Sequence, residues 1–357
     1  MDPPDASRRI IDTVENQHTG NNDLVRVLAG DIGGTKTRLA VFDVAGTELV
    51  TVAEQTYGSQ AYTSLREIIR HFLDQHSIDT EAACFGIAGP VRGDAVDTTN
   101  LPWHINAIEL RGDTGIAQIS LLNDLEANAW GIRALSAEDF SSLQDAAGDA
   151  MGNRAVIAAG TGLGEAGLFH DGVELHPFAT EGGHADFSPN SDQEIELLRF
   201  LVQRHRHVSW ERLLSGPGLV NIHDFLRHYH HSRVPAWLSD EMHSGDPAAA
   251  ISSAAQSQRD AICAEALNLF VHLYGVEAGN LALKTLATGG LYVGGGIAPR
   301  ILDVMQGGAF IKAFLSKGRM QALLEKIPVQ VILNDKTALY GPAVFAARKH
   351  AGRRSSE

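Results

Sequence analysis

One glycine-rich stretch constrains the fold more than any other part of the chain. Residues 28–43 read LAGDIGGTKTRLAVFD, in which three glycines and an aspartate lie between two apolar runs. The apolar runs predict two strands, and a third predicted strand, LVTVAEQTY, follows after a short Ala-Gly-Thr turn. The glycines therefore join strand to strand. Walker loops and dinucleotide-binding loops join a strand to a helix, so the sequence excludes both.

The same pattern returns in the middle of the chain. Residues 156–169 read VIAAGTGLGEAGLF, again an apolar run, a turn with several glycines and a second apolar run. Predicted strands alternate with predicted helices along the whole sequence, which indicates an α/β protein. With 357 residues, the chain is long enough for two lobes. We therefore expect one glycine hairpin in each lobe, the two facing each other across a cleft.

Glycine turns of this kind expose backbone N–H groups, which bind anionic oxygens such as those of a phosphate. Asp31 lies inside the first turn and cannot bind phosphate directly, because both are anions. It can instead hold Mg²⁺, usually through water, and the metal then bridges to phosphate. Either turn alone could be only a tight hairpin, but the second copy makes that interpretation weaker. The ATP-binding residues predicted from the two turns, with Asp31 acting through the metal, are Gly30, Asp31, Gly33, Gly34, Thr35, Gly160, Thr161 and Gly162.

Five further motifs accompany the hairpins: TNLPW, LLNDLEANA, EGGHADFSP, ERLLSGPGLVNI and GGLYVGGGIAPRIL. Together they resemble bacterial-type glucokinase, a family of the actin-like ATPase and sugar kinase superfamily. The resemblance covers roughly residues 28–346 and preserves the order of the motifs. It implies an α/β chain with the two-lobed fold of an actin-like ATPase (ribonuclease H-like) and an interlobe cleft.

The resemblance also implies roles for individual residues. Asp124 would be the general base that takes the proton of the sugar 6-hydroxyl as this oxygen attacks the γ-phosphate of ATP. An aspartate at such a strand-to-helix junction can alternatively be just the helix N-cap. The implied sugar-binding residues are Asn100, Asn123, Asp124, Glu181, His184 and Glu211. The glycines implied to leave room for adenine and ribose are Gly289, Gly295 and Gly296.

The implied activity is phosphorylation of D-glucose by ATP to glucose 6-phosphate with Mg²⁺, the first step of glycolysis, by a cytoplasmic homodimer. A kinase for fructose or mannose is the alternative among enzymes. A sugar-sensing regulator or an actin-type nucleotide-binding scaffold, both non-catalytic, is the alternative outside them. The regulator would need a helix-turn-helix, for which the N-terminal tail is too short. It would also need a Cys-rich zinc motif, which two isolated cysteines cannot form.

Composition narrows the range of partners. The net charge of −14 argues against binding to nucleic acid. No apolar run reaches the ~20 residues of a membrane-spanning helix. Cys84 and Cys263 lie in apolar runs, which indicates reduced, buried thiols. The histidines around residues 223–231 predict a polar surface rather than a metal site, since no cysteine or carboxylate completes a set of ligands.

The domain boundaries follow from the motifs and from the polar N-terminus. Residues 1–23 are expected to form a polar tail. A small α/β lobe is predicted from residues 24–134 together with 335–357, whose last segment returns to it as a helix. A large α/β lobe is predicted from residues 135–334.

Overall fold

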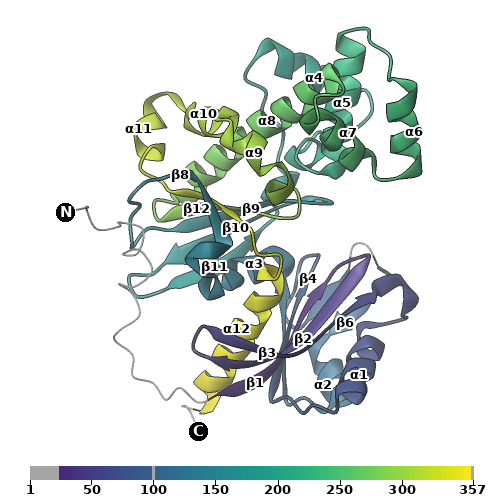
Figure 1. Ribbon diagram of the computed structural model, residues 1–357. Coiled ribbons are helices and arrows are strands. Elements are labelled where there is room, and N and C mark those ends of the chain that lie inside the picture. Colours follow the sequence, from purple (N-terminus) through teal and green to yellow (C-terminus); the bar gives the residue numbers. More distant parts are fainter. Residues whose placement is uncertain (1–23, 99–100, 355–357) are drawn as a thin grey trace, which may run out of the picture. The chain divides into compact units, whose positions relative to one another are not determined.

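The computed structural model describes residues 24–98 and 101–354. They form two compact units, the first comprising the described residues up to 134 and from 336 on, and the second residues 135–335 (Figure 1). The predicted tail and Asn100 lie outside the described residues.

The first unit is built on a five-stranded sheet with the strand order β3-β2-β1-β4-β7. Strands β1 and β2 are antiparallel, as are β2 and β3, whereas β4 runs parallel to β1 and β7 parallel to β4. The three predicted N-terminal strands are thereby confirmed. The strands of the sheet are β1 Val25–Ile32, β2 Lys36–Ala45, β3 Glu48–Gly58, β4 Ala82–Ile87 and β7 Gln118–Asn123. The remaining elements of the unit are the hairpin β5 Ala95–Asp97 and β6 His104–Asn106, and helices α1 Leu65–His76, α2 Ala107–Thr114, α3 Asp124–Gly131 and α12 Thr337–Arg354.

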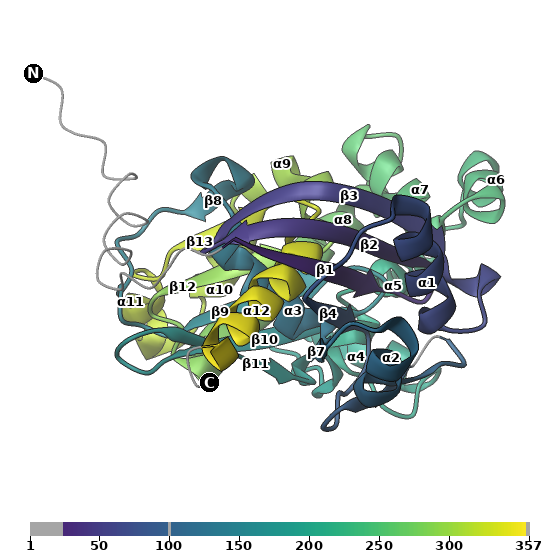
Figure 2. The same ribbon diagram turned by 90° about the horizontal axis from the view of Figure 1, so that it is seen from below.

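Helices cover both faces of this sheet. Successive side chains of a strand point to opposite faces, so Leu28 packs with α1 and α2 on one face. Its neighbour Val27 packs on the other face with Leu339 and Ala343 of α12. Figures 1 and 2 show α12, in yellow, on the face opposite α1 and α2. The central strands are therefore buried on both sides, as expected for parallel strands between helices.

The second unit repeats this arrangement of strands. Its six-stranded sheet has the order β11-β10-β9-β12-β13-β8, with β9, β10 and β11 consecutively antiparallel and β12 and β13 parallel to β9. The sequence echo between the two glycine stretches thus reflects the same hairpin at the same place in two sheets. The strands are β8 Phe140–Gln144, β9 Arg154–Ala159, β10 Leu163–His170, β11 Leu175–Thr180, β12 Gly290–Gly294 and β13 Val329–Ile332.

Helix α8 organises the core of the second unit. It is 25 residues long, and 14 of them are buried, including Tyr274 and Phe270. Gly275 lets it approach α10 closely, because a Cβ there would overlap the carbonyl oxygen of Phe310. The helices of the unit are α4 Asp192–Val202, α5 Gly216–Tyr229, α6 Ala236–Ser244, α7 Pro247–Gln256, α8 Ala261–Thr285, α9 Leu302–Gln306, α10 Ala309–Leu315 and α11 Gln321–Leu324.

Two expectations from composition concern buried groups and membranes. Cys84 and Cys263 are both buried and free, as predicted. Over residues 24–98 and 101–354, none of the helices combines the length and the apolar character needed to cross a bilayer.

Candidate nucleotide and sugar sites

The first glycine turn joins β1 to β2 and is held by a serine from the segment after β3. The backbone N–H of Gly33 donates to the carbonyl of Lys36 at 2.9 Å, which closes the turn. Ser59 donates its backbone N–H to the carbonyl of Thr35 (3.0 Å) and its hydroxyl to that of Gly33 (2.7 Å). Sequence reasoning missed Ser59, because no local pattern marks a serine that acts on a turn 26 residues away.

Asp31 lies at the end of β1, half-buried and directly across from Arg38 on β2. Burial raises the pKa of the Asp31 carboxyl to about 6, although the positive charge of Arg38 opposes this rise. Arg38 is bound by Glu54 (Nε to Oε1, 2.7 Å), and Glu54 also accepts from Lys336 (2.7 Å). Asp31 is therefore a carboxylate whose charge is incompletely compensated by the protein, and a cation would compensate it.

The predicted catalytic pair lies where β7 ends and α3 begins. Asn123 is the N-cap of α3: its Oδ1 accepts from the backbone N–H of Leu125 (2.9 Å) and of Glu126 (3.4 Å). Its side-chain N–H also donates to the carbonyl of Gly89 at 3.2 Å. The cap is thus Asn123 and not Asp124, whose half-buried carboxylate lies at the start of the helix and accepts from Leu125 at 3.0 Å.

The second glycine turn joins β9 to β10 and is supported by the first residue of α5 and by the segment before this helix. The backbone N–H of Gly160 donates to the carbonyl of Gly162 at 2.8 Å, and Gly216 donates to the carbonyl of Gly160 at 2.9 Å. Glu211 reaches the same turn, since its Oε2 accepts from the N–H of Leu163 at 3.1 Å. The structure therefore brings Glu211 next to the predicted phosphate turn.

A single 3₁₀ turn, Gly182–His184, follows β11; Glu181 precedes it and His184 is its last residue. Both side chains are exposed, with His184 Nε2 3.9 Å from Glu181 Oε2. Gly183 rests on the start of β10, because a Cβ there would overlap the carbonyl oxygen of Leu163. The predicted sugar contacts of the second unit thus gather with the second glycine turn around the beginning of β10.

The glycines around β12 separate into two groups. Gly295 follows the strand with φ +82°, and a Cβ on it would lie 2.9 Å from the carbonyl carbon of Ala159, at the end of β9. Gly289 precedes the strand and packs against the turn at Gly152, donating its N–H to the carbonyl of Asn153 at 2.9 Å. The length of β12 separates the two ends by roughly 20 Å. Gly289 therefore serves a turn at the end of β12 opposite to Gly295.

At two other predicted nucleotide-binding positions, neither the packing of the protein nor the backbone conformation demands a glycine. Apart from the adjacent residues, no described atom lies within 4 Å of where a Cβ on Gly160 or Gly296 would be, and neither glycine has a positive φ. By contrast, Gly30 is required by packing, since a Cβ there would lie 2.7 Å from the ring of Phe85. Open space in front of a glycine is what a closely approaching ligand needs.

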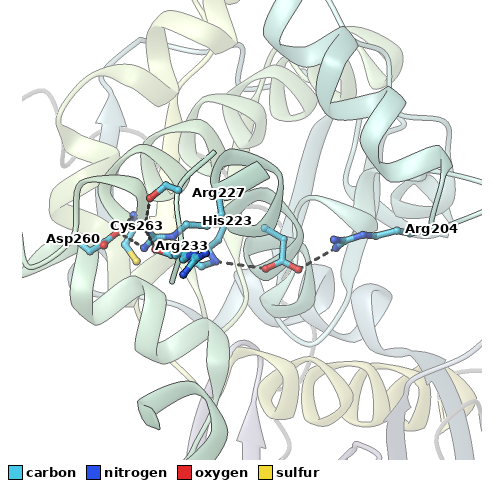
Figure 3. A network of polar contacts seen from close by, with 8 residues as sticks. Arg204, His223, Arg227, Arg233, Asp260 and Cys263 are labelled. Atoms are coloured by element: carbon cyan, nitrogen blue, oxygen red, sulfur yellow. Dashed lines mark hydrogen bonds and ion pairs between the residues drawn. The ribbon is translucent and has the colours of Figure 1, made fainter. Parts of the chain in front are cut away.

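The histidine-rich segment contributes to a polar network inside the second unit. His223 is buried in α5 and accepts from Arg227 Nε at 3.0 Å, while Arg227 donates to Asp260 at 2.6 Å and Asp260 accepts from the N–H of Cys263 at 2.9 Å (Figure 3). This network ties α5 to α8. Within the described ranges, no three His, Cys, Asp or Glu side chains gather as a metal would require.

Comparison with known proteins decides the family. The sequence model of the Glucokinase family matches residues 28–349. The chain belongs to the glucokinase family. The glucokinase of a Synechocystis strain is 42% identical over 349 residues, covering 91% of this chain and 98% of the relative. The glucokinase of Nostoc punctiforme is 41% identical, covering 90% and 99%.

Solved structures agree with this family. A glucokinase from an Antarctic psychrotroph is 31% identical with a TM-score of 0.81, covering 91% of this chain and all of that one. A ROK family glucokinase from Streptomyces griseus, in complex with glucose and AMPPNP, has a TM-score of 0.63, 21% identity and coverages of 90% and 99%, and shares the fold. The predicted family and the two-lobed α/β kinase fold are thereby confirmed.

Proposed function

We propose that the protein transfers the γ-phosphoryl group of ATP to the 6-hydroxyl of D-glucose, which gives ADP and glucose 6-phosphate, the first step of glycolysis. The observation that carries this proposal is the junction of β7 and α3. Asn123 caps the helix, and the carboxylate of Asp124 lies beside it at the first position of α3, where it accepts from the N–H of Leu125. Membership of the glucokinase family supports glucose as the acceptor.

Asp124 is the general base in this proposal. Its carboxylate takes the proton of the 6-hydroxyl while that oxygen forms a bond to the γ-phosphorus, and the bond from the γ-phosphorus to the bridging oxygen of ADP breaks. Asp124 lies at the beginning of α3, where the N–H groups of the first helical turn favour a negative charge.

The proposed sugar-binding side chains have hydrogen-bond acceptors or donors beyond those used in the contacts described above. Glu181 and His184 are exposed and available to neighbouring hydroxyl groups. Glu211 uses Oε2 for the backbone of Leu163, which leaves Oε1 to accept from a hydroxyl. Asn123 has one amide hydrogen beyond its donation to Gly89. Asn100 completes the proposed set on the family resemblance alone.

The two glycine turns and the turn after β12 would bind the nucleotide. The proposed contacts are Gly30, Gly33, Gly34, Thr35, Gly160, Thr161, Gly162, Gly295 and Gly296. Mg²⁺ would come with ATP, ligated mainly by phosphate oxygens and water, with Asp31 contributing a carboxylate through water. The incompletely compensated charge of Asp31 fits this role. When bound, the metal supplies neutralisation of the phosphate charge.

We also propose that the enzyme is a cytoplasmic homodimer in which the first unit is the small lobe and the second the large lobe. Two free, buried thiols support a reducing compartment. The homodimer rests on the family resemblance, and sedimentation velocity would test it directly.

The activity is tested by following ADP release with ATP, Mg²⁺ and a panel of D-glucose, D-fructose and D-mannose. We expect kcat/KM to be highest for glucose. ADP release that is independent of sugar, or a preference for another hexose, would contradict the proposal.

The base is tested with Asp124→Asn, which keeps the size of the side chain and removes its basicity. We expect kcat to fall by at least ~10²-fold, while glucose binding measured by calorimetry persists. Asp74→Asn, at an exposed aspartate of α1, is the matched control and should leave kcat unchanged. A near-normal kcat in Asp124→Asn, or a loss confined to KM, would rule out Asp124 as the base.

A further inference from the structure

Two carboxyl groups meet in the interior of the second unit, beneath the turn that carries Glu181 and His184. Glu165 of β10 is 2% exposed and Glu277 of α8 is 0% exposed. The two carboxyl groups lie close enough for the negative charge of Glu277 to act on Glu165. Two ionised carboxylates side by side in the interior repel each other, and neither can donate a hydrogen bond to the other, so the arrangement favours a proton on one of the two.

The surroundings identify Glu165 as the protonated member. Glu277 is served by two donors, Asn280 Nδ2 at 2.7 Å and Lys284 Nζ at 3.1 Å. The Oε1 of Glu165 receives no hydrogen bond from any donor in the part of the chain that the structure describes. Burial, and then the negative charge of Glu277, raises the pKa of Glu165 to about 8.

Further charged groups lie around the pair on each neighbouring element. Lys284 opposes the rise in the pKa of Glu165 and lies on α8. Lys317, after α10, donates to Asn280 Oδ1 at 2.7 Å, and burial lowers its pKa. Tyr274 is buried in α8 and donates its hydroxyl to backbone carbonyls rather than to the pair. Glu194 of α4 acts on Lys317. None of these groups supplies a hydrogen bond to Glu165 Oε1 within the described residues.

Glu165 is also in direct contact with the sugar-binding turn. A Cβ on Gly182 would overlap Glu165 Oε2, so the carboxyl lies against the backbone of the turn. Thr180 strengthens this connection, because its hydroxyl donates to the carbonyl of Glu165 at 2.9 Å and accepts from the N–H of Gly182 at 3.2 Å. A displacement of the Glu165 side chain is therefore transmitted to Gly182.

We propose that Glu165 is a positioning residue of the sugar site: it shares a proton with Glu277, and the resulting pair holds the turn Gly182–His184 in place for glucose. This inference rests on the proposed function. Loss of the proton places two negative charges in contact, and their repulsion moves Glu165 against Gly182. Glucose affinity then falls in alkaline solution, whereas the phosphoryl transfer step at Asp124 is affected less.

The test compares the wild type with Glu165→Gln. Glutamine has the shape of a protonated glutamate, donates to Glu277 and does not titrate. In the wild type we expect the glucose KM to rise several-fold above about pH 8, with a smaller change in kcat. In Glu165→Gln the KM should match the neutral wild-type value and stay constant with pH. Glu165→Leu should raise KM at every pH, and rescue by glutamine separates a proton-dependent role from simple packing.

A matched control is Glu196→Gln, which changes an exposed glutamate of α4 and should retain the wild-type KM profile. Thermal unfolding gives a readout that does not depend on activity. The pKa of Glu165 is 4.5 in the unfolded chain and about 8 in the folded protein, so between these two values only the folded protein holds the proton. Stability from this group is therefore lost as pH rises through that window, so Tm should fall more steeply in the wild type than in Glu165→Gln.

The outcomes separate the two proposals. If no sugar is phosphorylated but the Tm profiles differ as expected, the proposed function is wrong and the proton on Glu165 is real. If glucose is phosphorylated and Glu165→Gln retains the alkaline rise in KM, the inference is overturned. Should Glu165→Gln not fold, infrared spectroscopy of the wild type decides: the C=O band of a protonated carboxyl must be present near neutral pH and absent above about pH 9.

Discussion

Replacing Gly341 by alanine tests the packing of α12 on α3, the helix that begins at Asp124. A Cβ on Gly341 would overlap the carbonyl oxygen of Ala127 and would lie 2.7 Å from its carbonyl carbon and 2.8 Å from the nitrogen of Gly131. All three are backbone atoms, so no side-chain rotation relieves the overlap. The two helices must separate to accept the methyl group.

The magnitude follows from two opposing effects. Alanine is favoured over glycine inside a helix by about 1 kcal/mol, which alone would stabilise α12. Overpacking costs ~1–3 kcal/mol, and a clash with rigid backbone belongs at the upper end or beyond. We therefore expect a net loss of about 2 kcal/mol in the free energy of unfolding. For a unit of this size, that corresponds to a decrease in Tm of roughly 4–8 °C.

The assay is thermal unfolding followed by circular dichroism, combined with kcat. Gly352→Ala, near the end of the same helix, is the control, because no described atom lies within 4 Å of its added Cβ. We expect its Tm to equal or slightly exceed that of the wild type. We also expect Gly341→Ala to lower kcat, because a displaced α3 carries Asp124 with it. A Gly341→Ala variant as stable as Gly352→Ala would refute the tight α3–α12 contact.

Two further predictions concern the nucleotide. Because the pKa of Asp31 is raised to about 6, its carboxylate is protonated as pH falls through that value, so the KM for ATP should rise there and added Mg²⁺ should move the rise to lower pH. The control Asp74→Asn should show the same pH dependence of the KM for ATP as the wild type. If Asp31→Asn also kept this pH dependence, Asp31 would be excluded as the titrating group. Gly296→Ala meets no protein atom, so Tm should stay constant while the KM for ATP rises by about tenfold, the equivalent of ~1.4 kcal/mol. Gly112→Ala, equally open, should change neither quantity, and an unchanged KM in Gly296→Ala would place the nucleotide elsewhere.

The sequence alone was sufficient for the features that depend on a few consecutive residues. The apolar runs on either side of Gly33 and of Gly162 predicted two strand-turn-strand hairpins, and both are present. Strand and turn preferences act over a handful of residues, so a single sequence reveals them. The order of the motifs was enough to predict the family, which the comparisons confirmed.

Only the tertiary structure shows which single side chains are buried and which hydrogen bonds and contacts they make. At the β7–α3 junction, the sequence left open whether Asp124 is the helix cap, and the structure gives that role to Asn123, which also donates to the carbonyl of Gly89. The glycines on either side of β12 looked like one group in the sequence. The strand between them sends Gly289 to the turn at Gly152 and Gly295 to the end of β9.

Glu165 illustrates the same limit most clearly. In the sequence it is an acidic residue in a run of small and apolar ones, which is the only signal it gives. Its contact with Glu277 joins β10 to α8, and its contact with Gly182 joins it to the turn after β11. Whether a carboxyl is charged depends on the donors and charges within a few ångströms of it. Those neighbours come from distant segments, and only the folding of the second unit brings them together.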